Sequence, residues 1–128
     1  MTKVVLDASA LIAYIRKEPG LKNVLDLLPH AVMSSVNYAE VVTVLSRLDM
    51  TSDIIENILK NLIGRVMPFD QSQALVTGVL QRQTKSKGLS LGDRACIALG
   101  VHLQVPIYTA DKIWADLALE HADIRLIR

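Results

Sequence analysis

Short apolar runs alternate with longer amphipathic stretches along most of the chain. The runs have the length and aliphatic content of buried strands, and they lie at residues 3–6, 31–33, 65–68, 106–108 and 124–127. The stretches between them carry apolar residues at spacings of three and four. This spacing predicts helices over residues 9–16, 21–28, 36–48, 53–63, 71–84, 91–103 and 112–119.

Such an alternation favours an α/β fold with a central parallel sheet, because parallel strands are joined by crossover connections that are usually helical. The strands are almost continuously apolar, so helices are expected on both faces of the sheet. The 128 residues fit a single domain, 1–128, with one core. Residues that favour helix ends agree with this reading: Ser35 and Ser52 are potential caps, and Asp70 with Gln73 resembles a capping box.

Composition narrows the classes of function. Hydrophobic residues make up 51% of the chain but aromatic residues only 4%, so the core must be aliphatic. The formal net charge is +1, which gives no indication of a nucleic-acid or membrane partner, and such a partner would have to be recognised locally. Cys96 is the only cysteine, which excludes an internal disulfide framework. With no signal-peptide pattern and no run of about 20 apolar residues, a cytoplasmic protein is expected.

Four acidic residues stand among apolar neighbours at the ends of different elements. Asp7 directly follows the first strand, Glu40 lies early in the helix after the second, Asp93 is in the first turn of a later helix, and Asp111 follows the fourth strand. Because the carboxyl ends of parallel strands meet at one rim of a sheet, these side chains are expected to converge. None has a basic partner on its own face, so a hard divalent cation such as Mg²⁺ or Mn²⁺ would compensate their charge.

Each acid also has a simpler structural interpretation. Asp7 and Asp111 follow strands, where aspartate often closes a turn or caps a helix. Asp93 completes a Ser90-x-x-Asp93 capping box, and an acid there suits the helix dipole. Only Glu40 has no capping role. Convergence on one rim is the reason to prefer a shared site over four separate caps.

Four segments of the sequence resemble a known family of proteins. The segments that carry the resemblance are Val5-Leu6-Asp7-Ala8-Ser9-Ala10-Leu11, Tyr38-Ala39-Glu40-Val41, Leu91-Gly92-Asp93-Arg94-Ala95-Cys96-Ile97-Ala98-Leu99-Gly100 and Tyr108-Thr109-Ala110-Asp111. Together they resemble the PIN-domain ribonucleases, and among these the VapC-type toxins of toxin-antitoxin pairs. The similarity covers essentially the whole chain; each segment is weak by itself, whereas the combination is specific.

The resemblance implies a three-layer α/β/α sandwich, Mg²⁺ or Mn²⁺ at the acidic pocket, and endonucleolytic cleavage of RNA. It also implies a homodimer and a VapB-like antitoxin that occludes the site. By position, the family's acidic quartet corresponds to Asp7, Glu40, Asp93 and Asp111. Asp116 lies where some members have a further acid, although an ordinary solvated position fits it as well. Two hydroxyl residues, Ser9 and Thr109, match positions that orient a carboxylate or a water.

Several other residues have both a functional and a structural interpretation. Arg82, Lys85 and Lys87 precede the Asp93 helix and Arg94 follows Asp93, so these four could contact an RNA backbone or could simply be solvated. Trp114 could stack on a base, but a tryptophan in an amphipathic helix more often packs on the sheet. Cys96, mid-helix between apolar residues, is expected in the core and not as a nucleophile.

Two other classes of function are alternatives to the nuclease. A receiver domain shares the size and architecture, but it would require paired acids after the first strand and a lysine after the fifth, and neither is present. A non-catalytic nucleic-acid- or partner-binding module with a PIN-like fold remains the alternative, and an intact acidic quartet argues against it. Excess aliphatic positions on two helices, for example Leu25, Leu28, Ile55 and Leu59, predict a surface that a partner or a second subunit covers.

Overall fold

A five-stranded sheet forms the centre of the computed structural model, which describes residues 3–128. All strand pairs are parallel, as the sequence predicted. The strands are β1 (Val4–Leu6), β2 (Ala31–Ser34), β3 (Arg65–Met67), β4 (Ile107–Thr109) and β5 (Ile124–Leu126). Their order across the sheet is β3-β2-β1-β4-β5, so β1 is the central strand.

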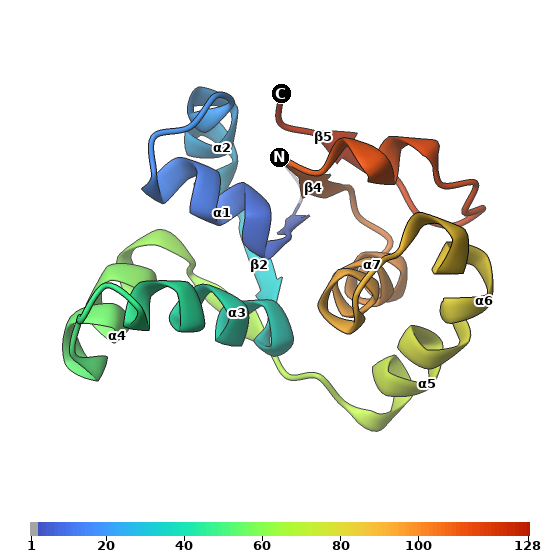
Figure 1. Ribbon diagram of the computed structural model, residues 1–128, viewed down its shortest axis with the longest axis horizontal. Coiled ribbons are helices and arrows are strands. Elements are labelled where there is room, and N and C mark those ends of the chain that lie inside the picture. The colour runs from blue at the N-terminus through green and yellow to red at the C-terminus, as the bar shows by residue number, and fades with distance from the viewer. Residues whose placement is uncertain (1–2) are drawn as a thin grey trace.

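Helices cover both faces of this sheet (Figure 1). They are α1 (Ala8–Ile15), α2 (Leu21–Leu27), α3 (Ser35–Ser46), α4 (Ser52–Leu62), α5 (Gln71–Val79), α6 (Gln81–Thr84) and α7 (Leu91–Leu103), with short 3-10 helices η1 (Leu28–His30), η2 (Lys85–Lys87) and η3 (Lys112–Asp116). Successive residues of β1 point to opposite faces: Val4 and Leu6 pack with α1 to α4, whereas Val5 packs with α7 and η3. The predicted α/β/α sandwich is therefore confirmed.

Helix α7 is the most deeply buried helix on the face of the sheet to which Val5 points. Its residues from Ala95 to Gly100 are all buried. Gly100 lets α7 approach β4, because a β-carbon at this position would overlap the Ile107 side chain. No helix within residues 3–128 combines the length and apolar character that crossing a membrane requires.

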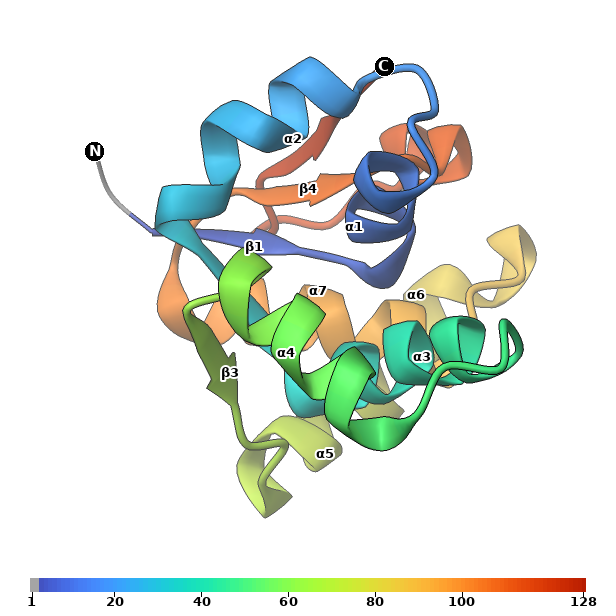
Figure 2. The same cartoon turned by 90° about the vertical axis from the view of Figure 1, so that its left-hand side faces the viewer.

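The order of the strands places a crevice beside β1. After β1 the chain moves outward through β2 to β3, and then it returns to the opposite side of β1 for β4 and β5. Figure 2 shows β1 and β4 side by side, both running toward the end at which α1 begins. In open parallel sheets, ligands bind outside the carboxyl ends of the strands where the order reverses in this way. The residues that follow β1 and β4 therefore lie at the expected ligand-binding edge.

Two predicted helices are wrong in extent. The helix expected over residues 71–84 is divided at Leu80 into α5 and α6, directly after Gly78 and the β-branched Val79, two residue types that form helices poorly. The helix expected over residues 112–119 is only the 3-10 helix η3, because Leu117 adopts an extended conformation. Leu119 nevertheless packs against the core. The apolar spacing over residues 112–119, which predicted a helix, therefore reflects the burial of a segment that is not helical beyond Asp116.

Two predicted caps are displaced by one residue. Ser34, not Ser35, caps α3 by accepting a hydrogen bond from the amide of Val36, and Thr51, not Ser52, caps α4. The Ser35 hydroxyl instead accepts from the amide of Phe69 at 3.0 Å. Although the shift at α3 is small, the position of its first residue determines which of its side chains face the crevice.

Candidate active site

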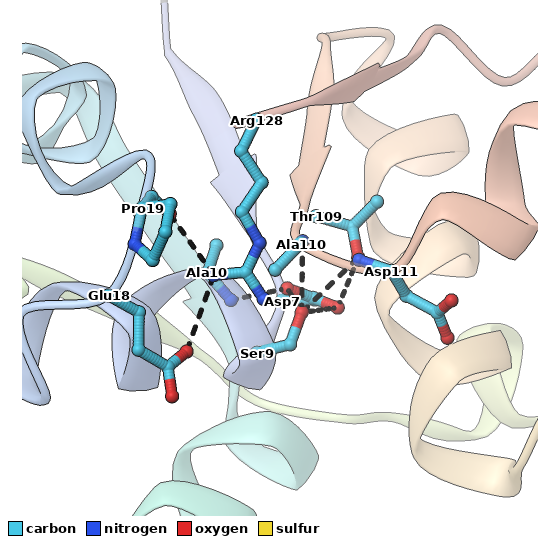
Figure 3. Close-up of polar contacts among 9 residues, drawn as sticks. All are labelled: Asp7, Ser9, Ala10, Glu18, Pro19, Thr109, Ala110, Asp111 and Arg128. Carbon is cyan, nitrogen blue, oxygen red and sulfur yellow. Dashed lines mark hydrogen bonds and ion pairs between the residues drawn. The ribbon is translucent and has the colours of Figure 1, made fainter.

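Asp7 lies at the carboxyl end of β1, where it begins α1. Its side chain is 4% exposed and accepts a hydrogen bond from the amide of Ala10 at 2.8 Å, which caps the helix. The hydroxyl of Ser9 donates to the carboxylate, 2.8 Å from each oxygen, and that of Thr109 donates to Oδ2 at 2.7 Å. Figure 3 shows both hydroxyl groups pointing at Asp7. Thr109 ends β4, and Asp7 directly follows the neighbouring strand β1, so the pairing of these strands brings the two residues together.

The environment of Asp7 raises the pKa of its carboxyl group from 3.8 to about 6. Burial is the main cause, because it disfavours the charged form. The hydrogen bonds from Thr109, Ala10 and Ser9 lower the pKa and offset part of this effect, while the negative charge of Asp93 raises it slightly. The buried carboxylate is thus ionised at neutral pH but costly to keep charged, and positive charge bound beside it would relieve that cost.

Glu40 and Asp93 approach the crevice from α3 and α7. The amide nitrogen of Asn37 donates to Glu40 Oε1 at 2.7 Å and to the carbonyl of Gly92 at 2.9 Å. A β-carbon at Gly92 would lie 2.5 Å from Oε2 and 2.6 Å from Oε1 of Glu40. The Glu40 carboxylate therefore rests on the first turn of α7, one residue before Asp93.

Asp93 and Asp111 both cap helices. Asp93 Oδ2 accepts from the amide of Ser90 at 3.0 Å, and the Ser90 hydroxyl accepts from the amide of Asp93 at 3.2 Å, which completes the capping box. Asp111 Oδ1 accepts from the amide of Ile113 and caps η3. The Thr109 hydroxyl accepts from the amide of Asp111 at 3.0 Å, which links Asp111 to the Asp7 cluster. The capping interpretation is therefore correct for all three aspartates.

The four acids nevertheless share one cavity. It has a volume of ≈240 Å³ and is lined by Asp7, Ala8, Ser9, Ile12, Asn37, Glu40, Val44, Asp93 and Asp111. Each capping hydrogen bond uses one oxygen of a carboxylate and restricts the rotation of that side chain. Capping a helix and lining the cavity are thus compatible for the three aspartates.

The chemistry of this donor set fits a hard divalent cation, since the cavity presents carboxylate oxygens and no thiol or imidazole ligand among its lining residues. Within residues 3–128, however, no three His, Cys, Asp or Glu side chains lie close enough together to hold one ion. Figure 3 shows the Asp111 carboxylate directed away from that of Asp7. Rotation of the Asp93 and Asp111 side chains toward Asp7 and Glu40 would be needed to bring free oxygens to a shared point.

Comparison with known proteins decides the family. The PIN domain family model matches residues 4–120. The chain belongs to the PIN domain family. The resemblance found in the sequence is thereby confirmed. A search of curated protein sequences gave no significant match.

Solved structures share this PIN domain fold at low sequence identity. A toxin-antitoxin complex from Klebsiella pneumoniae is 16% identical, with 98% of each chain covered and a TM-score of 0.77. DNA-bound VapBC from Salmonella typhimurium is 14% identical over 100% of each chain, with a TM-score of 0.72. VapBC2 from Rickettsia felis, bound to a DNA fragment from its promoter, is 15% identical over 98% of each chain, with a TM-score of 0.73.

One residue of the PIN domain cavity was missed by sequence reasoning. Asn37 is 1% exposed and joins Glu40 on α3 to Gly92 on α7. Its position, one helical turn before Glu40, places the two side chains on the same face of α3. That spacing was a usable signal, but a single asparagine in an apolar helix does not indicate which neighbouring element it will meet.

Other predicted site residues lie outside the cavity of this PIN domain. Arg94 is directed to α5, where its guanidinium donates to the carbonyl of Thr77 at 3.0 Å. Asp116 is exposed at the end of η3 and does not line the cavity. Trp114 is fully buried against the sheet, so its ring is not available to stack on a base. The basic residues of α6 and η2 are exposed: Arg82, Lys85 and Lys87.

Cys96 lies within the core of the PIN domain, as expected, and is fully buried in α7. Burial raises the pKa of its thiol well above the usual value, and the negative charges of Asp7, Asp93 and Glu40 raise it further. Since the thiolate is the nucleophilic form, this cysteine is unsuited to nucleophilic catalysis.

Proposed function

We propose that this PIN domain is a metal-dependent endoribonuclease. The observation that carries the proposal is the single cavity at the carboxyl rim of the sheet, which four acids from four separate segments line. Such a carboxylate set is suited to hydrolysis of phosphodiester bonds assisted by Mg²⁺ or Mn²⁺. Membership of the PIN domain family supports the assignment.

Asp7, Glu40, Asp93 and Asp111 are the residues that would hold the cation. When bound, it supplies a lowered pKa for the attacking water and positive charge to neutralise the phosphate. Ser9 and Thr109 keep the Asp7 carboxylate oriented: the Ser9 hydroxyl shares its proton between the two oxygens, and the Thr109 hydroxyl donates to Oδ2. The carboxylate oxygens of Glu40 and Asp111 that are not used in hydrogen bonds within residues 3–128 are available to accept a proton from the attacking water.

The direct test is cleavage of total RNA by the purified protein, followed by mapping of the new ends. The wild type is expected to cut internal phosphodiester bonds with Mg²⁺ or Mn²⁺ and to stop in EDTA, while Asp111→Asn leaves the RNA intact. The exposed basic residues Arg82, Lys85 and Lys87 are the candidates for backbone contacts beside the cavity. Absence of cleavage under all metal conditions, with RNA still bound, would favour the alternative of a non-catalytic PIN-like binding module.

The role of Asp93 can be separated from simple capping by its response to metal. Asp93→Asn keeps an oxygen that can accept from Ser90, so loss of the dipole interaction should destabilise the metal-free protein by at most about 1 kcal/mol, and relief of repulsion with Asp7 should reduce that cost. Added Mg²⁺ should raise the melting temperature of the variant less than that of the wild type, because the folded state binds the ion less tightly.

Asp70→Asn is a matched control for this experiment. Asp70 caps α5 through the amide of Gln73 at 2.9 Å but does not line the acidic cavity. Its substitution should leave the Mg²⁺-induced rise in melting temperature unchanged. An Asp93→Asn protein that is less stable in EDTA yet responds to Mg²⁺ as the wild type does would reduce Asp93 to a cap.

We further propose that the protein is the toxin of a toxin-antitoxin pair, forms a homodimer and is inhibited by a VapB-like antitoxin. The support is the shared fold with chains from structures described as VapBC or toxin-antitoxin complexes. The apolar surface predicted from the sequence is only partly correct. Ile55 and Leu59 are core residues, whereas Leu25 and Leu28 line a surface pocket of ≈340 Å³.

A larger apolar surface lies along α5. Leu75, Val76 and Val79 are 70%, 40% and 46% exposed, and they border a cavity of ≈380 Å³ that α7 and residues 119–122 also line. If a second copy covers this surface, Leu75→Lys should shift the protein toward the monomer in sedimentation velocity. Ile54→Lys on α4 is the control, since Ile54 is 51% exposed but does not line this cavity. Equal self-association of both variants and the wild type would place the dimer contact elsewhere.

A further inference from the structure

Asn37 is a buried amide that bridges two helices from a single nitrogen atom. Nδ2 donates to Glu40 Oε1 within α3 and to the carbonyl of Gly92 in α7, at 2.7 and 2.9 Å. Both partners are acceptors, so the reverse orientation of the amide would place its oxygen against two other oxygens. The hydrogen bonds thus determine which way the amide faces and hold the Glu40 carboxylate against α7.

Gly92 supplies the other half of this arrangement. Because it has no side chain, the Glu40 carboxylate can rest directly on the first turn of α7, in the space that a β-carbon would occupy. Glutamate has several rotatable bonds, and this contact removes most of their freedom. The carboxylate is fixed between the Asn37 amide on one side and the α7 backbone on the other, next to the residue that precedes Asp93.

The amide is poorly explained by stability alone. Asn37 is 1% exposed, and its Oδ1 has no hydrogen-bond partner within residues 3–128. A buried polar atom without a partner destabilises a protein, so the unpartnered Oδ1 offsets part of the stability that the two hydrogen bonds of Nδ2 provide. The residue at this position is therefore better suited to controlling Glu40 than to holding α3 and α7 together.

We propose that Asn37 is a positioning residue of the cavity, which with Gly92 fixes the Glu40 carboxylate on the helix that carries Asp93. This inference rests on the proposed metal-dependent nuclease function. Asn37 does not itself react. It holds the Glu40 carboxylate against the helix that carries Asp93, so that Glu40 does not have to be ordered when a cation binds.

A double-mutant cycle between Asn37→Ala and Glu40→Gln tests this role. Asn37→Ala should slow single-turnover RNA cleavage about 10- to 100-fold, as is usual for residues that orient metal ligands. In the Glu40→Gln background the same substitution should cause no further loss, because Asn37 acts through Glu40. Mn²⁺ affinity, measured from the paramagnetic resonance signal of the free ion, should fall in Asn37→Ala and show the same lack of additivity.

Gln73 provides a matched control for the burial of an amide. It is 4% exposed on α5, donates to a single backbone carbonyl at 3.1 Å, and has an unpartnered Oε1, but it does not line the acidic cavity. Gln73→Ala is expected to lower the melting temperature while cleavage and Mn²⁺ affinity stay at the wild-type level. If Asn37→Ala lowered the cleavage rate by the same factor in the wild type and in Glu40→Gln, the proposal would be overturned.

Gly92→Ala tests the same contact from the opposite side and keeps Asn37 intact. Alanine favours the helix, so α7 should remain formed while the new methyl group displaces the Glu40 carboxylate. Reduced cleavage and weaker Mn²⁺ binding are expected even if Asn37→Ala does not fold. Wild-type behaviour of Asn37→Ala or Gly92→Ala, alongside an inactive Glu40→Gln, would overturn the positioning role alone, whereas a fully active Glu40→Gln would overturn the nuclease site itself.

Discussion

Replacing Asp7 by asparagine is expected to lower the rate of RNA cleavage by at least about 100-fold while the protein stays folded. Asparagine caps helices as well as aspartate does, so the hydrogen bond from Ala10 should survive. The Ser9 hydroxyl can still donate to the amide oxygen, and the amide nitrogen, in the place of Oδ2, can donate to the Thr109 hydroxyl instead of accepting from it. What disappears is the negative charge of the most buried of the four acids.

The measurement is the single-turnover rate with RNA and metal at saturation, compared among the four variants Asp7→Asn, Glu40→Gln, Asp93→Asn and Asp111→Asn. Asp26→Asn, at an exposed position of α2, is the control and should cleave at the wild-type rate. Circular dichroism and melting curves establish that each variant is folded. Full activity in Asp7→Asn would show that the cavity is not the catalytic centre.

The stability of the metal-free protein should depend on pH through Asp7. The pKa of this group is about 6 in the folded state against 3.8 for an unperturbed aspartate, so the folded state binds more protons than the unfolded state between these values. The contribution of Asp7 to stability is therefore fully present below pH 3.8 and is lost as the pH rises through 6. A difference of this size corresponds to about 3 kcal/mol in the free energy of unfolding.

Asp7→Asn isolates this contribution from the titration of other groups. In EDTA, the stability of the variant relative to the wild type should increase steadily from about pH 4 to pH 7, as measured by urea unfolding. Mg²⁺ should reduce the difference, since a cation favours the ionised wild-type carboxylate. Thr109→Val should raise the pKa of Asp7 further, because the Thr109 hydrogen bond lowers it. A difference between variant and wild type that is constant over this pH range would contradict the raised pKa.

The pattern of residues in the sequence was sufficient to predict the parallel sheet and the edge of the sheet at which the acids lie. All five strands are short and mostly aliphatic, and the three central ones, β2, β1 and β4, are largely buried, so their positions could be predicted within about two residues. Once the sheet is parallel, an acid that follows β1 and one that follows β4 must share a rim. The capping interpretation of Asp7, Asp93 and Asp111 was not a true alternative, because a capping aspartate at this rim also faces the cavity.

Contacts between distant segments could not be predicted in the same way. The direction of the Arg94 side chain depends on how closely α5 packs on α7. It points to α5, because the backbone carbonyl of Thr77 accepts a hydrogen bond from its guanidinium. The partnership of Asn37 with Gly92 spans 55 residues and exists because α3 and α7 are adjacent in space. The apolar periodicity near η3 reflects burial of an irregular segment, which no local propensity distinguishes from a helix.

The hydrogen bond between Thr109 and Asp7 connects residues 102 positions apart. Strand β4 lies beside β1, so the pocket around Asp7 is complete only after nearly all of the strands have been synthesised. A chain still attached to the ribosome and ending before residue 107 has neither the Thr109 hydroxyl nor Asp111. Because domains fold as units during synthesis, the cavity that we propose as the active site cannot form until residues 107–111 have been made, and the nuclease activity that we propose for it can begin only then.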